Sequence, residues 1–264
     1  YKIIYCSISA YGGEGPIGHR PAYDHVVQAM SGIMSTTGPE NSSPTKVGAP
    51  YIDYATGLNA AFAVMAALRE RDRTERYQIV DVAMLDTALN LMANNVVTTA
   101  NTGVELPKLG NEAASRAPSS GCFETQDGGL IMLAANNERQ FADLCLVVGH
   151  EEWVTDSRWK NPIVRSENQE TLRQALIEVF LTKSAQDWER KLDGAGVPAS
   201  RVRTLNEVIS EGQPEARSLL AELKVGDAQI PTRLPAIGFR LNGDSLQPES
   251  APRRVGEDNK RYFS

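Results

Sequence analysis

Two short runs rich in β-branched and aromatic residues constrain the fold most, because segments with helical periodicity separate them. The runs cover residues 1–9 and Tyr77–Val82, and both are typical of buried strands. Apolar residues recur at spacings of three and four over Tyr23–Met34, over a segment that ends near Arg69, and over Met84–Thr99. Strands that alternate with helices in this way predict an α/β domain with a mostly parallel sheet.

The central helix of this series carries an apolar stripe that we expect to be buried against the rest of the domain. The stripe consists of Leu58, Ala61, Phe62, Met65 and Leu68.

A segment punctuated by glycine and proline, Val47–Gly57, leads into this helix and holds the carboxylate of Asp53. Gly48 and Gly57 indicate a backbone that turns where a Cβ would clash, or that closely approaches another group. Asp53 stands three residues before Thr56, so the simplest interpretation is a helix N-cap, worth about 1 kcal/mol. A functional carboxylate is the alternative, and the spacing alone favours the cap.

Composition excludes several classes of protein. The 264 residues are 41% hydrophobic and 23% charged, as expected for a soluble globular protein. A net charge of −6, spread along the chain, does not fit a nucleic-acid-binding surface, and no apolar run is long enough to cross a membrane. The three scattered cysteines predict reduced structural thiols in a cytoplasmic protein, without the spacing of a metal site. The sequence opens inside a strand-like run without an initiator Met, so we expect a piece of a longer chain.

The second half of the chain has its own composition and predicts a separate unit. A linker rich in Gly, Pro, Ser and Asn covers Asn101–Gly121, and Asp127-Gly128 then predicts a hairpin turn between two strands. Helices are predicted at Glu138–Val148 and Asn168–Leu181, and a further one after Ser184, whose hydroxyl would form its cap.

The loop after the first strand is rich in glycine, but its order does not match the dinucleotide-binding pattern. A cofactor loop and a plain turn remain equally open. Arg20, Tyr23 and Asp24 gather where the next helix starts, and the positive end of the helix dipole favours anions there.

Several motifs, in order and over nearly the whole chain, resemble class III CoA-transferases. This family includes formyl-CoA and carnitine CoA-transferases, with α-methylacyl-CoA racemases as close relatives. The main motifs are Arg20-Pro21-Ala22-Tyr23-Asp24, Gln28-Ala29-Met30-Ser31-Gly32, Asp53-x-x-x-Gly57 and Gln78-Ile79-Val80-Asp81-Val82-Ala83-Met84.

The resemblance implies a two-domain fold whose larger domain is Rossmann-like, here incomplete at its N-terminus, and a homodimer of interlocked chains. The expected divisions are 1–100 for the C-terminal part of the large domain, 101–121 for a linker, 122–212 for a small α+β domain and 213–264 for a segment that returns to the large domain.

The resemblance also implies a chemistry in which Asp53 is the nucleophile that attacks an acyl-CoA thioester. The carboxylate would pass through an acyl anhydride and an aspartyl-CoA thioester, and a carboxylic acid acceptor would then take the CoA. Tyr23 and Asp24 would support Asp53, and backbone N–H groups around Gly48 and Gly57 would stabilise oxyanions. Arg20 and Lys46 are candidates for contacts with CoA phosphates. No metal or permanently bound cofactor is expected.

Two alternatives remain at this stage. The racemase relatives place a histidine directly before the aspartate that corresponds to Asp24, whereas this chain has Tyr23 there, with His25 expected on a different helix face. This difference favours the transferase over the racemase. The second alternative is a truncated, non-catalytic fragment that serves as a binding or dimerisation module.

Overall fold

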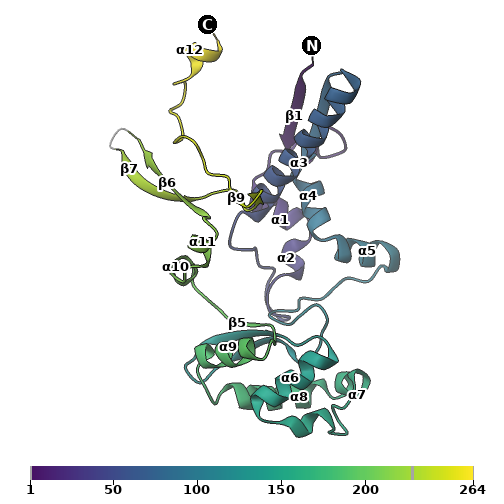
Figure 1. Ribbon diagram of the computed structural model, residues 1–264. Coiled ribbons are helices and arrows are strands. Elements are labelled where there is room, and N and C mark those ends of the chain that lie inside the picture. The colour runs from purple at the N-terminus through teal and green to yellow at the C-terminus, as the bar shows by residue number, and fades with distance from the viewer. Residues whose placement is uncertain (1, 227–228, 264) are drawn as a thin grey trace. The chain divides into compact units, whose positions relative to one another are not determined.

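The computed structural model describes residues 2–226 and 229–263 and divides into two compact units, Tyr1–Ala199 and Ser200–Ser264 (Figure 1).

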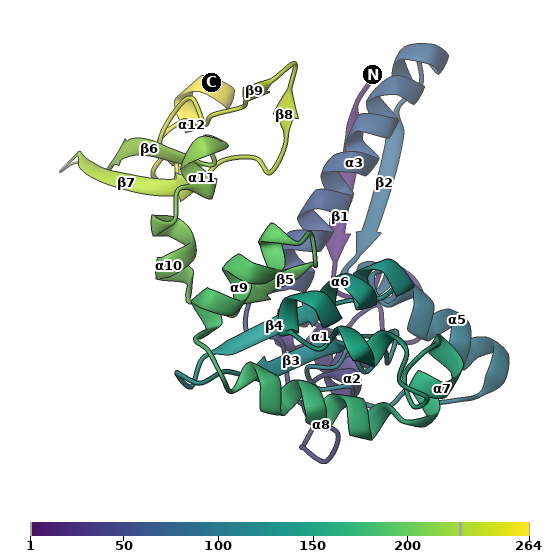
Figure 2. The same ribbon diagram turned by 60° about the horizontal axis from the view of Figure 1, so that its bottom comes forward.

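The first part of unit 1 alternates strands and helices as the sequence predicts. Its elements are β1 (Ile4–Ser9), α1 (Asp24–Met30), α2 (Ile33–Thr36), α3 (Tyr51–Thr74), β2 (Gln78–Ala83), α4 (Met84–Leu91) and α5 (Ala93–Thr102). Strands β1 and β2 pair in parallel, with Ile4 opposite Gln78 and Ser9 opposite Ala83. Helix α3 packs along both strands (Figures 1 and 2). The fold is therefore mixed α/β, with a parallel strand pair.

Two of the predicted helices are each split in two. Between α1 and α2, Gly32 adopts a left-handed φ of 87°, which interrupts the helix. Between α4 and α5, the N–H of Met92 donates to the carbonyls of both Ala88 and Leu89, and the helical path breaks there. Apolar periodicity continues across both breaks, and so the sequence predicted single helices.

The prediction of a buried stripe on α3 is wrong. Leu58, Phe62 and Met65 are 72%, 75% and 65% exposed. The helix starts at Tyr51 and buries the opposite side, which consists of Ile52, Thr56, Ala60 and Ala67. Small side chains let α3 lie close to the strand pair, whereas periodicity identifies an apolar side without showing what covers it.

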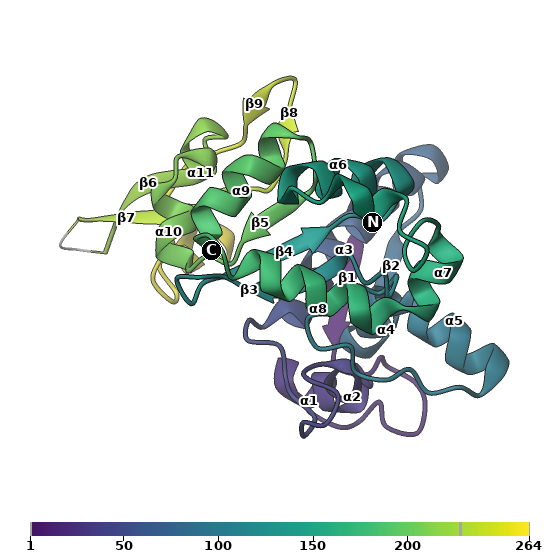
Figure 3. The ribbon, with the colours of Figure 1, turned by 90° about the horizontal axis from the view of Figure 1, so that it is seen from below.

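The second part of unit 1 is a β-hairpin with helices packed against it (Figures 2 and 3). Its elements are β3 (Ser120–Glu124), β4 (Leu130–Ala134), α6 (Glu138–Val148), the 3-10 helix η1 (Glu151–Val154), α7 (Pro162–Glu167), α8 (Gln169–Phe180) and α9 (Ala185–Gly194). The hairpin, α6, α8 and α9 confirm the predictions to within two residues, while η1 and α7 were missed. Ser184 caps α9 as expected, since its hydroxyl accepts the N–H of Asp187.

This part holds the larger hydrophobic core. The ring of Phe123 in β3 packs against that of Phe180 in α8 at an interplanar angle of 34°. The Phe180 ring also contacts Trp188 of α9 in an edge-to-face arrangement. The Trp188 indole donates to the carbonyl of Phe180, so its buried N–H is satisfied. Arg165 is buried and forms two hydrogen bonds to the carboxylate of Glu138.

Unit 2 follows β5 (Ala199–Arg201), which spans the boundary between the units. Its further elements are α10 (Leu205–Ser210), α11 (Gln213–Ala216), β6 (Leu220–Val225), β7 (Ile230–Pro235), β8 (Arg240–Leu241), β9 (Asp244–Ser245) and α12 (Asn259–Tyr262). Strands β6 and β7 pair antiparallel. Among the residues described in this unit, only Pro214 and Ala221 are buried.

None of the helices in the described part of the chain is both long and apolar enough to span a membrane.

Candidate active site at the start of helix α3

Asp53 lies inside the first turn of α3 rather than before it. The helix begins at Tyr51, and Pro50 occupies the N-cap position without a side-chain hydrogen bond. The interpretation of Asp53 as the N-cap is therefore wrong, because that residue already has helical backbone.

The carboxylate that caps α3 belongs to Asp24, the first residue of α1. Its Oδ2 accepts the backbone N–H of Ile52 at 2.9 Å and that of Asp53 at 3.2 Å. Asp24 is only 6% exposed, so its charge is compensated mainly by these N–H groups and by the positive end of the helix dipole. A side chain from α1 thus holds the first turn of α3.

Gln28 completes this arrangement from the next turn of α1. Its Nε2 donates to Oδ1 of Asp24 at 2.5 Å, and its Oε1 accepts the N–H of Val47 at 2.9 Å. Gln28 is fully buried. No role was predicted for Gln28 from the sequence, although its position four residues after Asp24, on the same helix face, was a usable signal.

The side chain of Asp53 itself is free. The residue is exposed, and its carboxylate has no hydrogen bond or ion pair with any residue that the structure describes. The first turn of a helix favours a negative charge. The backbone of Asp53 is therefore held by Asp24, while the oxygens of its carboxylate are available to bind another molecule.

Gly48 and Gly57 do not mark sharp turns. Gly57 lies within α3, Gly48 lies in an exposed bend, and a Cβ on either would meet nothing within 4 Å. The expected clash is therefore wrong for both. Inside the helix, the N–H of Gly57 is used by the carbonyl of Asp53 one turn earlier, whereas the N–H of Gly48 has no partner among the described residues. The missing side chain of Gly57 leaves open the helix surface on the Asp53 side.

The cationic and aromatic candidates lie around the same loops. Tyr23 directly precedes α1 in extended conformation and is 77% exposed. Its ring stacks on His25 with the centroids 6.2 Å apart, so the expectation of different faces is wrong, because Tyr23 is not part of the helix. Lys46 is exposed and donates to the carbonyls of Val47 and Gly48, and Arg20 is exposed. No hydrogen bond or ion pair joins Tyr23 or His25 to Asp53 among the described residues.

Tyr51, the first residue of α3, adds a hydroxyl that sequence analysis missed. The pKa of the Tyr51 hydroxyl is raised above its usual value, mainly because the group is partly buried and to a smaller extent because the negative charge of Asp24 is near. The hydroxyl therefore remains protonated at neutral pH and can act as a hydrogen-bond donor.

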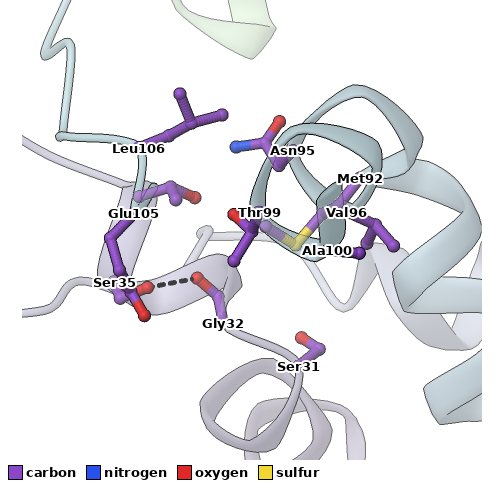
Figure 4. Close-up of a pocket in the computed structure, with 11 residues that line it drawn as sticks. Ser31, Gly32, Ser35, Met92, Asn95, Val96, Thr99, Ala100, Glu105 and Leu106 are labelled. Carbon is purple, nitrogen blue, oxygen red and sulfur yellow. Dashed lines mark hydrogen bonds between the residues drawn. The ribbon is translucent and has the colours of Figure 1, made fainter. Parts of the chain in front are cut away.

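A cavity of about 320 Å³ lies between the α1–α2 turn and α5, and Figure 4 shows Ser35 donating to the carbonyl of Gly32 at its edge. Hydroxyl groups, the amide of Asn95 and the carboxylate of Glu105 line it, with no lysine or arginine among its lining residues. Such a lining does not suit the phosphates of CoA. Within the described ranges, no group of three His, Cys, Asp or Glu side chains is placed to hold a metal ion.

Comparison with known proteins decides the family. The sequence profile described as CoA-transferase family III matches residues 1–259. The chain belongs to this family. The resemblance noted in the motifs around Asp24, Asp53 and Asp81 is thereby confirmed at the level of the family.

Two curated relatives and two solved structures illustrate the match. The chain is 33% identical to mouse succinyl-CoA:glutarate CoA-transferase over 99% of its length, and 32% identical to the Agrobacterium fabrum succinate–glutarate CoA-transferase over 100%. Its fold matches a crystal structure of Rv3272 from Mycobacterium tuberculosis with a TM-score of 0.83 at 27% identity, covering 98% of this chain and 68% of that one. A CAIB/BAIF family protein from Brucella suis gives 0.81 at 28% identity, covering 98% and 67%.

The chain spans only part of the curated relatives. It covers 59% of the length of the mouse enzyme and 65% of the Agrobacterium enzyme.

Proposed function

We propose that the protein is a CoA-transferase that moves CoA between carboxylic acids, with Asp53 as the nucleophile. The observation that carries the proposal is the state of Asp53: its backbone is fixed by a buried carboxylate, while its own oxygens are unengaged and exposed. Membership of CoA-transferase family III supports the reaction class.

The reaction would run through two pairs of covalent steps. An oxygen of Asp53 attacks the carbonyl of the donor thioester, forming a mixed anhydride and releasing CoA thiolate. The thiolate attacks the aspartyl carbonyl, which gives an aspartyl-CoA thioester and releases the donor acid. The acceptor carboxylate then opens this thioester, and the freed thiolate attacks the acceptor carbonyl of the new anhydride. The acyl-CoA product leaves, and Asp53 is again a carboxylate.

Each of these steps passes through a tetrahedral oxyanion, which requires hydrogen-bond donors. Two candidates lie close to Asp53 in the chain: the N–H of Gly48, which has no partner among the described residues, and the protonated hydroxyl of Tyr51. We assign Gly57 a steric role, because the missing side chain leaves room for a thioester beside Asp53. The N–H of Gly57 is used within the helix, so we withdraw it as an oxyanion donor.

The remaining assignments are proposals supported by position. Asp24 would hold the first turn of α3, and Tyr23 would contact the acyl group from its exposed position before α1. Arg20 and Lys46 are exposed cations that would meet CoA phosphates. Acyl-CoA and a carboxylic acid acceptor would be the substrates, without a permanently bound cofactor.

We also propose a homodimer in the cytoplasm, with a Rossmann-like large domain and the domain divisions given above. The exposed stripe of Leu58, Phe62 and Met65 on α3 supports a surface that another polypeptide covers, since monomeric proteins rarely leave a large contiguous apolar patch open. The mass of the full-length protein in solution tests the dimer, and a monomer at micromolar concentration would rule it out.

The test of Asp53 is chemical trapping in the full-length protein. Succinyl-CoA is incubated with the protein in the presence of hydroxylamine, which converts an anhydride or thioester on Asp53 into a hydroxamate, and the peptides are mapped by mass spectrometry. We expect the adduct on Asp53, and none in Asp53→Asn. The matched control Asp81→Asn, whose residue lies on β2, should label like the wild type. An adduct on another residue, or none with a panel of acyl-CoA donors, overturns the proposal.

Two further assays on the full-length protein distinguish the transferase from the racemase and from a non-catalytic module. A racemase would exchange the α-proton of a 2-methylacyl-CoA with deuterium from solvent, and His25→Ala would abolish this exchange. A non-catalytic module would form neither an adduct nor an exchanged product while still binding CoA or its partner.

A further inference from the structure

We propose that Gln28 is a positioning residue for the transferase reaction, because it fixes both the cap of α3 and the loop that leads into this helix. The inference rests on the proposed role of Asp53 and extends it to a residue that does not touch the substrate.

Gln28 first controls the orientation of Asp24. The Asp24 side chain must turn Oδ2 toward the N–H groups of Ile52 and Asp53. The amide of Gln28 holds the other oxygen, Oδ1, at 2.5 Å. Because Asp24 is buried, few water molecules can replace this donor if it is lost. Gln28 therefore determines which way the capping carboxylate points.

Gln28 also holds the loop before α3. The carbonyl oxygen of the Gln28 side chain accepts the N–H of Val47, which lies four residues before the helix. One amide group thus connects α1, the loop and the first turn of α3. A shift of Gln28 would displace the capping carboxylate and the loop together, and both lead directly to Asp53.

The chemical nature of the side chain matters as well. The site requires a donor on one end and an acceptor on the other, at the length of a glutamine. Glutamate would keep the acceptor for Val47 but would set a second carboxylate against Asp24. Methionine would keep the volume of the side chain and remove both hydrogen bonds. The two substitutions therefore separate the donor function from the whole contribution of the amide.

The experiment measures the single-turnover rate of adduct formation on Asp53 in the full-length protein, with succinyl-CoA as the probe. The reaction amplitude reports the fraction of active protein, so the rate constant describes only correctly folded molecules. We expect Gln28→Met and Gln28→Glu to lower this rate constant about 10–100-fold, the scale of a displacement near 1 Å at a reacting group. The half-saturating concentration of succinyl-CoA should change by less than about threefold, since Gln28 does not contact the substrate.

The matched control is Gln174→Met. Gln174 lies on α8 and donates to Glu178, a carboxylate one helical turn away, but it is exposed and belongs to the second part of unit 1. Its rate constant should equal that of the wild type. If Gln28→Met does not fold, Gln28→Glu, which keeps the hydrogen bond to Val47, decides the question.

A purely structural role for Gln28 would lower the amplitude and leave the rate constant unchanged, and that result overturns the inference. It differs from failure of the proposed function, in which the wild-type protein itself forms no adduct on Asp53.

Discussion

Replacement of Asp24 by alanine tests the claim that this residue holds the first turn of α3. The variant removes the acceptor of three hydrogen bonds, from the N–H groups of Ile52 and Asp53 and from the amide of Gln28. Ile52 and Gln28 are fully buried, so their donors lose their partners without full access to water. At about 1–3 kcal/mol for each unsatisfied buried group, the free energy of unfolding should fall by about 3 kcal/mol or more.

Asp24→Asn provides the internal comparison. Its carbonyl oxygen still accepts the two backbone N–H groups, but its NH₂ group then faces the NH₂ group of Gln28. If Gln28 turns over, the N–H of Val47 loses its acceptor. One hydrogen bond is lost in either case, which predicts a smaller decrease of about 1–2 kcal/mol.

Urea unfolding of the full-length protein at pH 7, followed by circular dichroism, measures these differences. Asp72→Ala serves as the control, because Asp72 is exposed and, among the described residues, its carboxylate bonds only to Arg71. It should change stability by less than about 0.5 kcal/mol. The reasoning is refuted if Asp24→Ala unfolds within that margin of the wild type, or if Asn and Ala at this position are equally destabilising.

Two further predictions concern the thiols and the larger core. Burial raises the pKa of the Cys145 thiol to about 12, whereas Cys6 is exposed. Iodoacetamide at pH 8 should therefore alkylate Cys6 first and leave Cys145 unmodified until the protein unfolds. Peptide mass mapping that finds Cys145 modified in the native protein would contradict this prediction. Leu176 of α8 is fully buried in the larger core, so Leu176→Ala should lower the free energy of unfolding by about 2–5 kcal/mol. Leu146 is largely exposed, and Leu146→Ala should lower it by less than about 0.5 kcal/mol. Equal losses of stability in thermal unfolding would contradict the position of this core.

Local signals in the sequence predicted the local structure well. Asp127-Gly128 specified the hairpin, and α6 ends at Val148 as predicted, before Gly149 in left-handed conformation. Each of these signals acts within a few residues. The parallel pairing of β1 and β2 followed from their alternation with helices.

Longer-range features could not be predicted in the same way. The rest of α1, α2 and a loop separate Asp24 from the first turn of α3, so no spacing rule connects the capping carboxylate to the N–H of Asp53. The sequence instead offered Asp53 as its own cap. The same limit explains the exposed stripe at Phe62, since periodicity does not identify the surface against which a helix packs.

The most direct test of Asp53 as the nucleophile follows one oxygen atom. In the proposed steps, an oxygen of the acceptor carboxylate remains on Asp53 after each turnover, and an oxygen of Asp53 leaves with the next donor acid. The full-length protein is incubated with succinyl-CoA and with glutarate labelled with ¹⁸O in both carboxylates. The mass of the peptide that contains Asp53 is then measured by mass spectrometry. The account predicts ¹⁸O in the carboxylate of Asp53 and in the released succinate. Turnover that leaves Asp53 and the succinate unlabelled would contradict it.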